Sequence, residues 1–364
     1  MHVDNRVSSY EGCLLGLAIG DVLGCAVDKL SIGEICERYG PNGLLGYDLQ
    51  GELAEVSSYT QLPAYLCAGL LVGLTRGRTD AYVRCISAAL REWAYCQQAR
   101  RAPDRSLCWL SQLPQFRRRL CMDTRMLDTL SRQTLGTPEE PVNTFVSAGA
   151  VTAPVAIGLF FSPARMEPLQ IGTLGAQTLA MLCGDPESFL CGAFLAYSIA
   201  GILQEPERPL SEHFGHAMET VCAQFEGKFP QAKTLSGRFH KVLAMTKDPE
   251  RMPRDAMEEL DCTTACGCTL GAVYASLSHA GSFDEALITA VNHSGRSAAV
   301  GALTGAILGA RLGSRELPDF YLEGLDTEAV LRELARDLTE GSPTSGIFDD
   351  DWDQKYAQGR PVNQ

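Results

Sequence analysis

The stretch GCLLGLAIGDVLGCAVD, residues 12–28, carries the clearest structural signal in the chain. Its apolar residues recur with the period of an α-helix, and Gly16, Gly20 and Gly24 follow one another at four-residue spacing. Glycines at that spacing share one face of a helix and leave it without side chains, so a second backbone can approach it closely. The stretch therefore predicts a buried helix that packs tightly against another helix.

The rest of the chain shows the same helical periodicity, with Gly and Pro at the joints. The run AAVGALTGAILGARLG, residues 298–313, indicates a second helix rich in small residues. The sequence lacks the alternating runs of Val, Ile and Thr that are typical of strands. We therefore predict an all-α fold without a significant sheet. It consists of one compact multi-helix domain over residues 1–340 and a polar, acidic-aromatic tail over residues 341–364.

The composition narrows the functional classes. The formal net charge of −13 argues against a broad nucleic-acid-binding surface, which needs clustered Lys and Arg. The one basic run, FRRRL at residues 116–120, is more typical of a solvated helix face than of a phosphate-binding patch. No secretory signal stands out, and no apolar stretch reaches the roughly 20 residues of a membrane span without polar interruption. We expect a cytoplasmic protein with no contact to membranes or nucleic acid.

Fourteen cysteines are scattered along the chain, most of them within apolar helical patterns. A free thiol in such a pattern behaves as a small apolar side chain. The densest group, Cys262, Cys266 and Cys268, would need a fourth ligand from elsewhere to bind zinc. Reduced thiols in the core are therefore favoured over a zinc site.

Three stretches occur in an informative order. They are the helix at residues 12–28, the polar loop SSYTQ at residues 57–61 and the run VNHSGRSAAVGALTGAILGARLG at residues 291–313. Together they resemble the ADP-ribosylglycohydrolase family, which includes the dinitrogenase-reductase-activating and ADP-ribosyl-arginine hydrolases. The resemblance extends over roughly residues 10–340. It implies that the first helix and the two polar loops lie side by side.

At both loops this sequence departs from the family pattern. The family has Thr-Asp-Asp-Thr-Gln in the first loop and Gly-Asp-x-Asp-Thr-Val-Gly in the second, and these acidic residues bind two Mg²⁺ ions. Here Ser58 and Tyr59 stand at the first pair of Asp, and Arg296 and Ala298 at the second. Mg²⁺ prefers carboxylate and water oxygens. The resemblance therefore predicts that the binuclear Mg²⁺ site is lost, and we expect no metal or other cofactor.

Two further family motifs are altered as well. The segment VSAGAV, residues 146–151, resembles the Gly-rich middle motif, but Thr152 and Ala153 stand where the family has Met-Arg. Cys183 stands at the His of a Thr-His turn. The loops nevertheless retain backbone N–H groups that could face a pyrophosphate.

We expect residues 57–60 to face residues 296–299 across a cleft. Arg296 either takes the place of the absent cations and binds a phosphate, or forms a salt bridge with Asp21 or Asp28. Asp28 and Asp21 are the candidate catalytic residues if any activity is retained, although a bracing role is more typical for Asp21 and a buried core position for His293. The candidate ligand-binding residues are Ser57, Ser58, Tyr59, Thr60, Ser147, Gly149, His293, Ser294, Gly295, Arg296 and Ser297.

Four functions remain open. The favoured one is a pseudoenzyme that binds an ADP-ribose-like or nucleotide ligand without hydrolysing it. The second is an interaction protein with a closed cavity, for which the acidic tail could contact a protein partner. The third is a metal-independent hydrolase of an ADP-ribosyl or N-glycosyl substrate, in which Asp28 and Asp21 act as acid and base. The fourth is an ordinary Mg²⁺-dependent hydrolase that recruits ligands from elsewhere in the chain.

Overall fold

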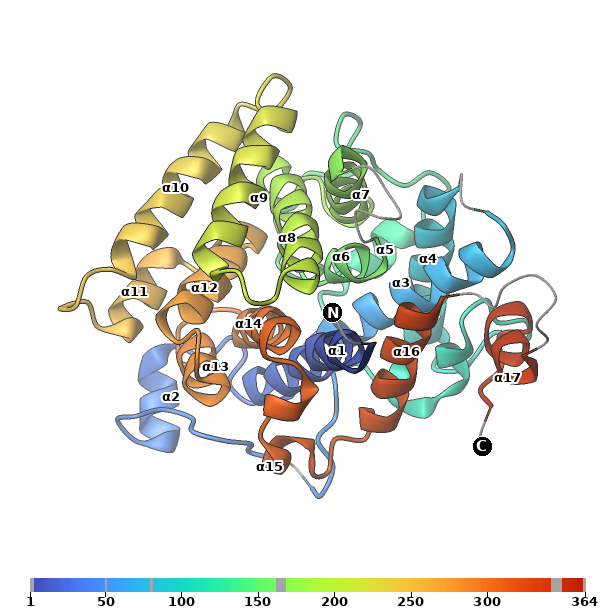
Figure 1. Cartoon of the computed structure of the whole chain (residues 1–364), viewed down its shortest axis with the longest axis horizontal. Coiled ribbons are helices and arrows are strands. Elements are labelled where there is room, and N and C mark those ends of the chain that lie inside the picture. The colour runs from blue at the N-terminus through green and yellow to red at the C-terminus, as the bar shows by residue number, and fades with distance from the viewer. Residues whose placement is uncertain (1–2, 50, 79–80, 162–167, 342–348, 363–364) are drawn as a thin grey trace.

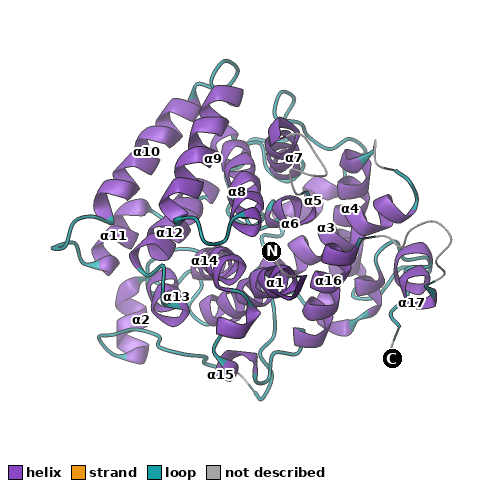
Figure 2. Cartoon of the chain, viewed as in Figure 1, coloured by secondary structure: helices purple, strands orange, loops and turns teal. Residues whose placement is uncertain are grey.

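The computed structural model describes residues 3–49, 51–78, 81–161, 168–341 and 349–362 of the chain. These residues fold into helices joined by loops, and no strand occurs among them (Figure 2). An isolated bridge in this part of the chain pairs Ala54 with Leu325. The predicted all-α class is therefore confirmed.

The helices have the following bounds in chain order. The first half contains α1 (Val3–Cys25), α2 (Ile32–Tyr39), α3 (Ser58–Thr75), α4 (Tyr82–Ala99), the 3-10 turns η1 (Trp109–Gln112) and η2 (Pro114–Arg117), α5 (Arg125–Leu130), α6 (Val155–Phe160) and α7 (Pro168–Ala180). The second half contains α8 (Pro186–Gln204), α9 (Leu210–Phe225), α10 (Gln231–Met245), α11 (Pro253–Leu260), α12 (Ala265–Ser278), α13 (Phe283–Val291), α14 (Ser297–Leu312), η3 (Ser314–Glu316), α15 (Asp319–Leu322), α16 (Glu328–Glu340), α17 (Asp350–Trp352) and the π-helical turn η4 (Asp353–Ala357).

An antiparallel pair formed by α1 and α14 lies in the middle of the molecule (Figure 1). The two backbones touch along a line of glycines. A Cβ atom at Gly16 would overlap the carbonyl oxygen of Gly305, and one at Gly20 would overlap that of Gly301. Larger residues would therefore push the two helices apart. The close helix pair that the glycine spacing predicts is confirmed.

Other helices pack around this pair. Figure 1 shows α8 and α12 on one side of it and α3 and α16 on the other. The helices α3, α8, α12 and α14 are apolar on nearly all faces and are almost wholly buried. This arrangement brings the C-terminal end of α1 and the N-terminal ends of α3 and α14 to one place.

One helix among the described residues, α8, is long and apolar enough to cross a membrane. It meets this test by length and overall composition, although Glu187 interrupts its apolar run, as the sequence predicted for every such stretch. However, 78% of its apolar window is buried inside the protein. Such burial is typical of the core helix of a globular protein.

The described part of the tail, residues 349–362, packs back onto its own chain. Trp352 and Tyr356 are buried, and the Trp352 Nε1–H donates to Thr75 Oγ1 at the end of α3 at 3.0 Å. Asp337 in α16 accepts a hydrogen bond of 2.5 Å from the Tyr356 hydroxyl and forms an ion pair of 2.5 Å with Lys355. These aromatic side chains are therefore not solvated, and a protein partner bound through the tail remains a prediction.

Cys25 and Cys121 are joined by a disulfide, and the other twelve cysteines are free. The bond links the end of α1 to the loop that follows η2. The expectation of reduced thiols is wrong for these two residues, because the fold brings them together from 96 positions apart in the sequence. Cys262, Cys266 and Cys268 are buried free thiols, as expected.

Candidate functional site

Asp21 lies in α1 directly beneath the first turn of α3. Its side chain is fully buried and accepts four hydrogen bonds. Ser57 donates its N–H at 2.8 Å and its hydroxyl at 2.5 Å, and Thr60 donates its N–H at 3.1 Å and its hydroxyl at 2.7 Å. Burial raises the pKa of Asp21 to about 6, although these hydrogen bonds oppose the rise. Asp21 thus braces the start of α3 against the helix that carries it.

Asp28 and Arg296 form an ion pair where the end of α1 meets the start of α14. The Arg296 Nε lies 3.2 Å from Asp28 Oδ2, and the two side chains are 13% and 4% exposed. Asp28 also accepts the N–H of Ala298 at 3.3 Å, and Arg296 Nη2 donates to the Cys121 carbonyl oxygen at 3.3 Å. Burial raises the pKa of Asp28, and the charge of Arg296 acts against that rise. Of the two arrangements expected for Arg296, the structure has the salt bridge, and its partner is Asp28.

Tyr59 closes the other side of this ion pair. The Arg296 guanidinium carbon lies 5.7 Å from the centre of the Tyr59 ring, within range of a cation–π interaction. Tyr59 is fully buried, and its carbonyl oxygen accepts a hydrogen bond of 2.7 Å from the Thr152 hydroxyl. Tyr59 of the first loop and Arg296 of the second therefore lie against each other, while the cleft expected between the two loops remains a prediction. We call this place, built from Asp28, Tyr59 and Arg296, the junction.

Two polar atoms beside the junction have no hydrogen-bond partner within the described residues. They are the Ser58 Oγ and the Tyr59 hydroxyl, and both are buried. Burial also raises the pKa of Tyr59 well above its usual value, so its phenol stays neutral at physiological pH. These groups contribute hydroxyls, but no negative charge, to the junction.

The other predicted residues of the second loop hold neighbouring segments in place. Ser294 Oγ accepts the first N–H of α2 at 2.9 Å, and the Gly295 carbonyl accepts an N–H from the turn after α1 at 2.7 Å. The Gly295 φ of 152° lies in the region that favours glycine. Ser297 Oγ donates to the His293 carbonyl at 3.4 Å, and burial lowers the pKa of His293. His293 is buried, as predicted, but its two ring nitrogens have no hydrogen-bond partner among the described residues. This loop as a whole connects α2, α13 and α14.

Ser147 and Gly149, the predicted residues of the middle motif, lie against Asp123. The Ser147 hydroxyl donates to Asp123 at 2.6 Å and accepts the Gly149 N–H at 2.9 Å. Arg125 forms an ion pair with Asp123 at 2.6 Å. Burial raises the pKa of Asp123, but the hydrogen bonds from Arg125 and Ser147 outweigh it and lower the pKa to about 2. The structure thus places a permanently charged pair on this motif.

The segment 117–125 is the part of the site that sequence reasoning missed. Cys121 contributes a carbonyl oxygen to Arg296 and a sulfur to the disulfide, and Asp123 organises the middle motif. A backbone carbonyl leaves no trace in a residue pattern, so no signal could have identified the first role. An Asp two residues before an Arg indicates a local pair, but it does not reveal that Ser147 joins it.

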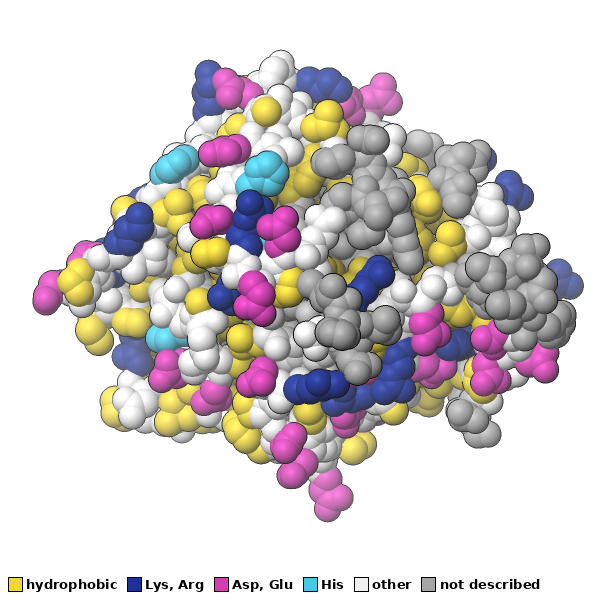
Figure 3. Space-filling view, in the orientation of Figure 1, with side chains coloured by type: hydrophobic (Ala, Val, Ile, Leu, Met, Phe, Trp, Pro, Cys, Tyr) yellow, Lys and Arg dark blue, Asp and Glu magenta, His cyan; other side chains and the backbone are white. Residues whose placement is uncertain are grey.

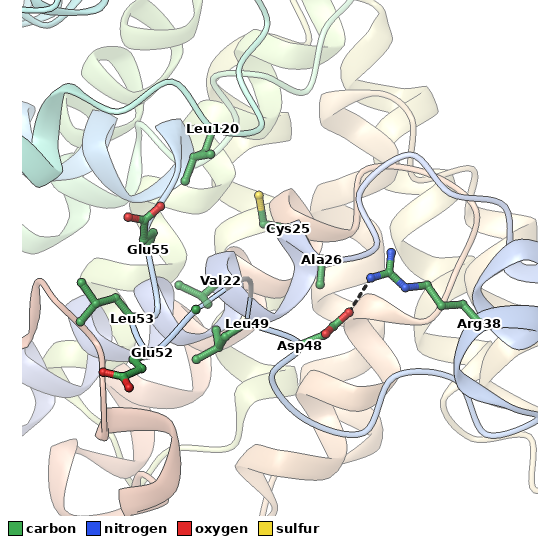
Figure 4. A pocket seen from close by; sticks show the side chains of 11 residues that line it. Val22, Cys25, Ala26, Arg38, Asp48, Leu49, Glu52, Leu53, Glu55 and Leu120 are labelled. Carbon is green, nitrogen blue, oxygen red and sulfur yellow. Dashed lines mark hydrogen bonds and ion pairs between the residues drawn. The ribbon is translucent and has the colours of Figure 1, made fainter.

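A cavity of about 520 Å³ lies beside the disulfide (Figure 4). Cys25 and Leu120 line one of its walls. Figure 4 shows the carboxylates of Glu52 and Glu55 at one side, and the ion pair between Arg38 and Asp48 at the other. With three carboxylates and one guanidinium in its lining, this cavity repels anions.

No group of three or more His, Cys, Asp or Glu side chains is arranged to hold a metal ion in the part of the chain that the structure describes. At the four positions where the family has Asp, the junction has the hydroxyls of Ser58 and Tyr59, the guanidinium of Arg296 and the methyl group of Ala298. The junction is thus built from the Arg296–Asp28 ion pair and neutral groups.

Comparisons with known proteins agree with the all-α fold. The model of the ADP-ribosylglycohydrolase family matches residues 2–346. No curated protein matches the chain. A solved structure described as an ADP-ribosylglycohydrolase-related protein complex superposes with a TM-score of 0.56 at 17% identity, over 93% of this chain and 100% of the other. That likeness shows the fold alone, whereas the family match spans nearly the whole sequence. The chain belongs to the ADP-ribosylglycohydrolase family.

Proposed function

We propose that this chain is a non-hydrolytic member of its family that binds a phosphate-bearing, ADP-ribose-like or nucleotide ligand. One observation carries the proposal. The Arg296 guanidinium, paired with Asp28 and packed on Tyr59, fills the place where the family's two acidic loops converge. A fixed positive charge there suits an anionic ligand and opposes a divalent cation.

The residues present do not fit Mg²⁺. This ion needs near-octahedral oxygen ligands, with carboxylates among them. Ser58 and Tyr59 offer neutral hydroxyls, Ala298 offers no donor atom, and the Asp28 carboxylate is engaged by Arg296 and the first turn of α14. The chemistry of the donor set therefore supports loss of the binuclear metal site, and no reaction step is assigned to a metal here.

Metal-independent hydrolysis has little support from the same geometry. A general acid or base needs an oxygen that can reach the substrate. All four hydrogen bonds of Asp21 go to Ser57 and Thr60, and its side chain is fully buried. Asp28 is 4% exposed, and its oxygens are engaged by the Arg296 guanidinium and the Ala298 N–H. Neither residue is free to transfer a proton to a ligand.

The remaining positive charges favour phosphate. Arg296 is partly exposed, and Arg125 beside the middle motif has a side chain that is 53% exposed. A guanidinium can engage its carboxylate through one edge and a phosphate through the other, because it carries five N–H donors in one plane. The loop that holds Ser147 and Gly149 lies next to Arg125 and would line the same ligand.

The interaction-protein reading is retained as a second candidate, because a specific observation favours it. Tyr59 is fully buried and Asp28 nearly so, which leaves Arg296 as the member of the junction with the most exposed side chain. If the junction admits no ligand in solution, its ion pair only stabilises the fold, and the protein acts through its surface.

The decisive experiment is a calorimetric titration with ADP-ribose. We would compare the wild type, Arg296→Ala, Arg296→Asp and Arg315→Ala, the last as a control at an exposed arginine away from the junction. We expect about tenfold weaker binding for Arg296→Ala, a larger loss for Arg296→Asp, and no change for Arg315→Ala. An assay of ADP-ribosyl-arginine hydrolysis with and without Mg²⁺ should show no turnover.

Three results would count against the proposal. Equal affinity in all four proteins would remove Arg296 from the site. Absence of binding in every protein would favour the interaction-protein reading. Mg²⁺-dependent turnover would show that the chain is an ordinary hydrolase with ligands recruited from elsewhere.

A further inference from the structure

A second group of positive charges lies outside the junction. Arg100, Arg117, Arg118 and Arg119 together line a hollow of about 370 Å³ on the surface, and Glu55 is the one acidic residue in its described lining. The lining thus carries four positive charges and one negative charge, in a chain whose net charge is −13. We call this place the arginine hollow.

Most of these guanidinium groups have no carboxylate partner. Arg118 is the exception, since it pairs with Glu55 at 3.2 Å and also with Asp326. Among the described residues, no carboxylate lies within ion-pair distance of Arg100, Arg117 or Arg119. Like charges gathered in one hollow repel each other, so the arrangement is stabilised when an anion joins them.

Figure 3 offers a contrast on the surface near α1 and α16, where a band of Lys and Arg side chains is accompanied by Asp and Glu. On α16, Arg332 and Arg336 both form ion pairs with Glu11 of α1. Those two arginines already have a carboxylate partner, so they need no external anion. In the arginine hollow, Arg100, Arg117 and Arg119 lack such a carboxylate partner among the described residues, and Arg118 alone is compensated.

The backbone beneath the hollow is held in place from below. Gln61 is fully buried, and its side-chain N–H donates to the Arg118 carbonyl at 2.9 Å. Its amide oxygen accepts hydrogen bonds from Trp93 Nε1 at 3.0 Å and from Gln97 at 2.9 Å. Arginines carried by a fixed loop lose less freedom when they bind a ligand than arginines on a mobile one.

Arg100 adds an observation of a different kind. It ends α4 with φ of 53°, a left-handed conformation that normally falls to glycine or asparagine. An arginine pays a steric cost there that glycine would not. Strained backbone conformations often occur at ligand-binding sites, and Arg100 lines the same hollow as three further arginines.

We propose that the arginine hollow binds the clustered phosphates of a soluble oligophosphate or nucleotide. Guanidinium groups bind phosphate oxygens in a bidentate manner, and a ligand with several phosphates carries enough negative charge to balance three unpaired guanidinium groups. The arginine hollow is separate from the junction. It is also distinct from the cavity of about 520 Å³ beside the disulfide, with which it shares Glu55 and Leu120. The proposal does not depend on a ligand at Arg296.

The test is a titration of the full chain with inorganic tripolyphosphate at low ionic strength. The proteins are the wild type, Arg117→Glu/Arg119→Glu, Arg117→Lys/Arg119→Lys and Arg315→Glu, the last as a control for loss of positive charge elsewhere. We expect binding to weaken by at least about tenfold in the Glu pair, by less in the Lys pair, and by less than about twofold in the control. Sulfate at the same ionic strength should compete poorly.

A second measurement uses the unmodified protein, so a folding defect in a variant cannot hide the answer. Phenylglyoxal labels accessible arginines, and mass spectrometry identifies each labelled position. Tripolyphosphate should slow the labelling of Arg100, Arg117 and Arg119 several-fold and leave Arg315 unchanged. Equal labelling rates with and without the anion, or equal affinity in all variants, would overturn the proposal. Measuring the affinity for ADP-ribose with the same variants distinguishes this site from the one at Arg296.

Discussion

The junction and the arginine hollow are both in contact with the segment 117–123, but their arginines differ in the partners that surround them. Arg296 in the junction has a buried carboxylate, an aromatic ring and a carbonyl oxygen as partners. Arg119 in the hollow is exposed and has no described ion-pair partner. The segment 117–123 reaches both places, since Arg117 lines the hollow and the Cys121 carbonyl binds Arg296. A guanidinium that stabilises the fold is thus surrounded by protein partners, whereas a guanidinium that we propose to bind a ligand has no carboxylate partner within the protein.

The largest expected effect on the free energy of unfolding is that of replacing Arg296 in the junction. Arg296→Ala would leave the Asp28 carboxylate buried without its cation, which typically costs about 3 to 5 kcal/mol of the free energy of unfolding. Urea denaturation monitored by circular dichroism would measure the loss. As a control, Asp28→Asn/Arg296→Met removes both charges and should recover most of it. A loss below about 1 kcal/mol for Arg296→Ala would show that Asp28 does not rely on the guanidinium.

A smaller effect is expected at Asp123, between the two regions. Its pKa of about 2 in the folded protein lies below the value of about 3.9 for an unfolded Asp, so the ionised form stabilises the fold. This contribution, roughly 2 kcal/mol, is complete above about pH 4 and is lost as the pH falls towards 2. The difference in unfolding free energy between the wild type and Asp123→Asn should therefore shrink over that interval. A difference that stays constant from pH 7 to pH 3 would contradict the assignment.

The smallest effect is expected in the arginine hollow. Arg119→Ala removes an exposed side chain without an ion-pair partner and should change the free energy of unfolding by no more than about 0.5 kcal/mol. Any change should favour stability, because one of several like charges is removed, and it should fade in 1 M salt. The same urea experiment would measure it beside Arg296→Ala. A loss above about 1 kcal/mol would mean that Arg119 has a structural partner, and the contrast between the two regions would fail.

Much of the site could be predicted from single residues and their neighbours. The glycine spacing predicted a first helix that packs closely on another helix, and the family resemblance predicted that it and the loop at residues 57–60 lie beside the loop that precedes α14. The choice between Asp21 and Asp28 as the partner of Arg296 could not be made in this way. The resemblance placed both Asp21 and Asp28 near the loop that precedes α14, so either could have been the partner of Arg296. The packing of α3 on α1 directs Asp21 to Ser57 and Thr60 instead.

The sequence by itself determined the helical fold, the family, and the replacement of four acidic positions by Ser58, Tyr59, Arg296 and Ala298. Such features are local, since periodicity and residue identity can be read along the chain. Only the tertiary structure decided that Cys25 meets Cys121 and that Arg100 joins the run at Arg117 to Arg119 in one hollow. The reason is physical: partners far apart in sequence are selected by the packing of whole helices, and no short pattern records that choice.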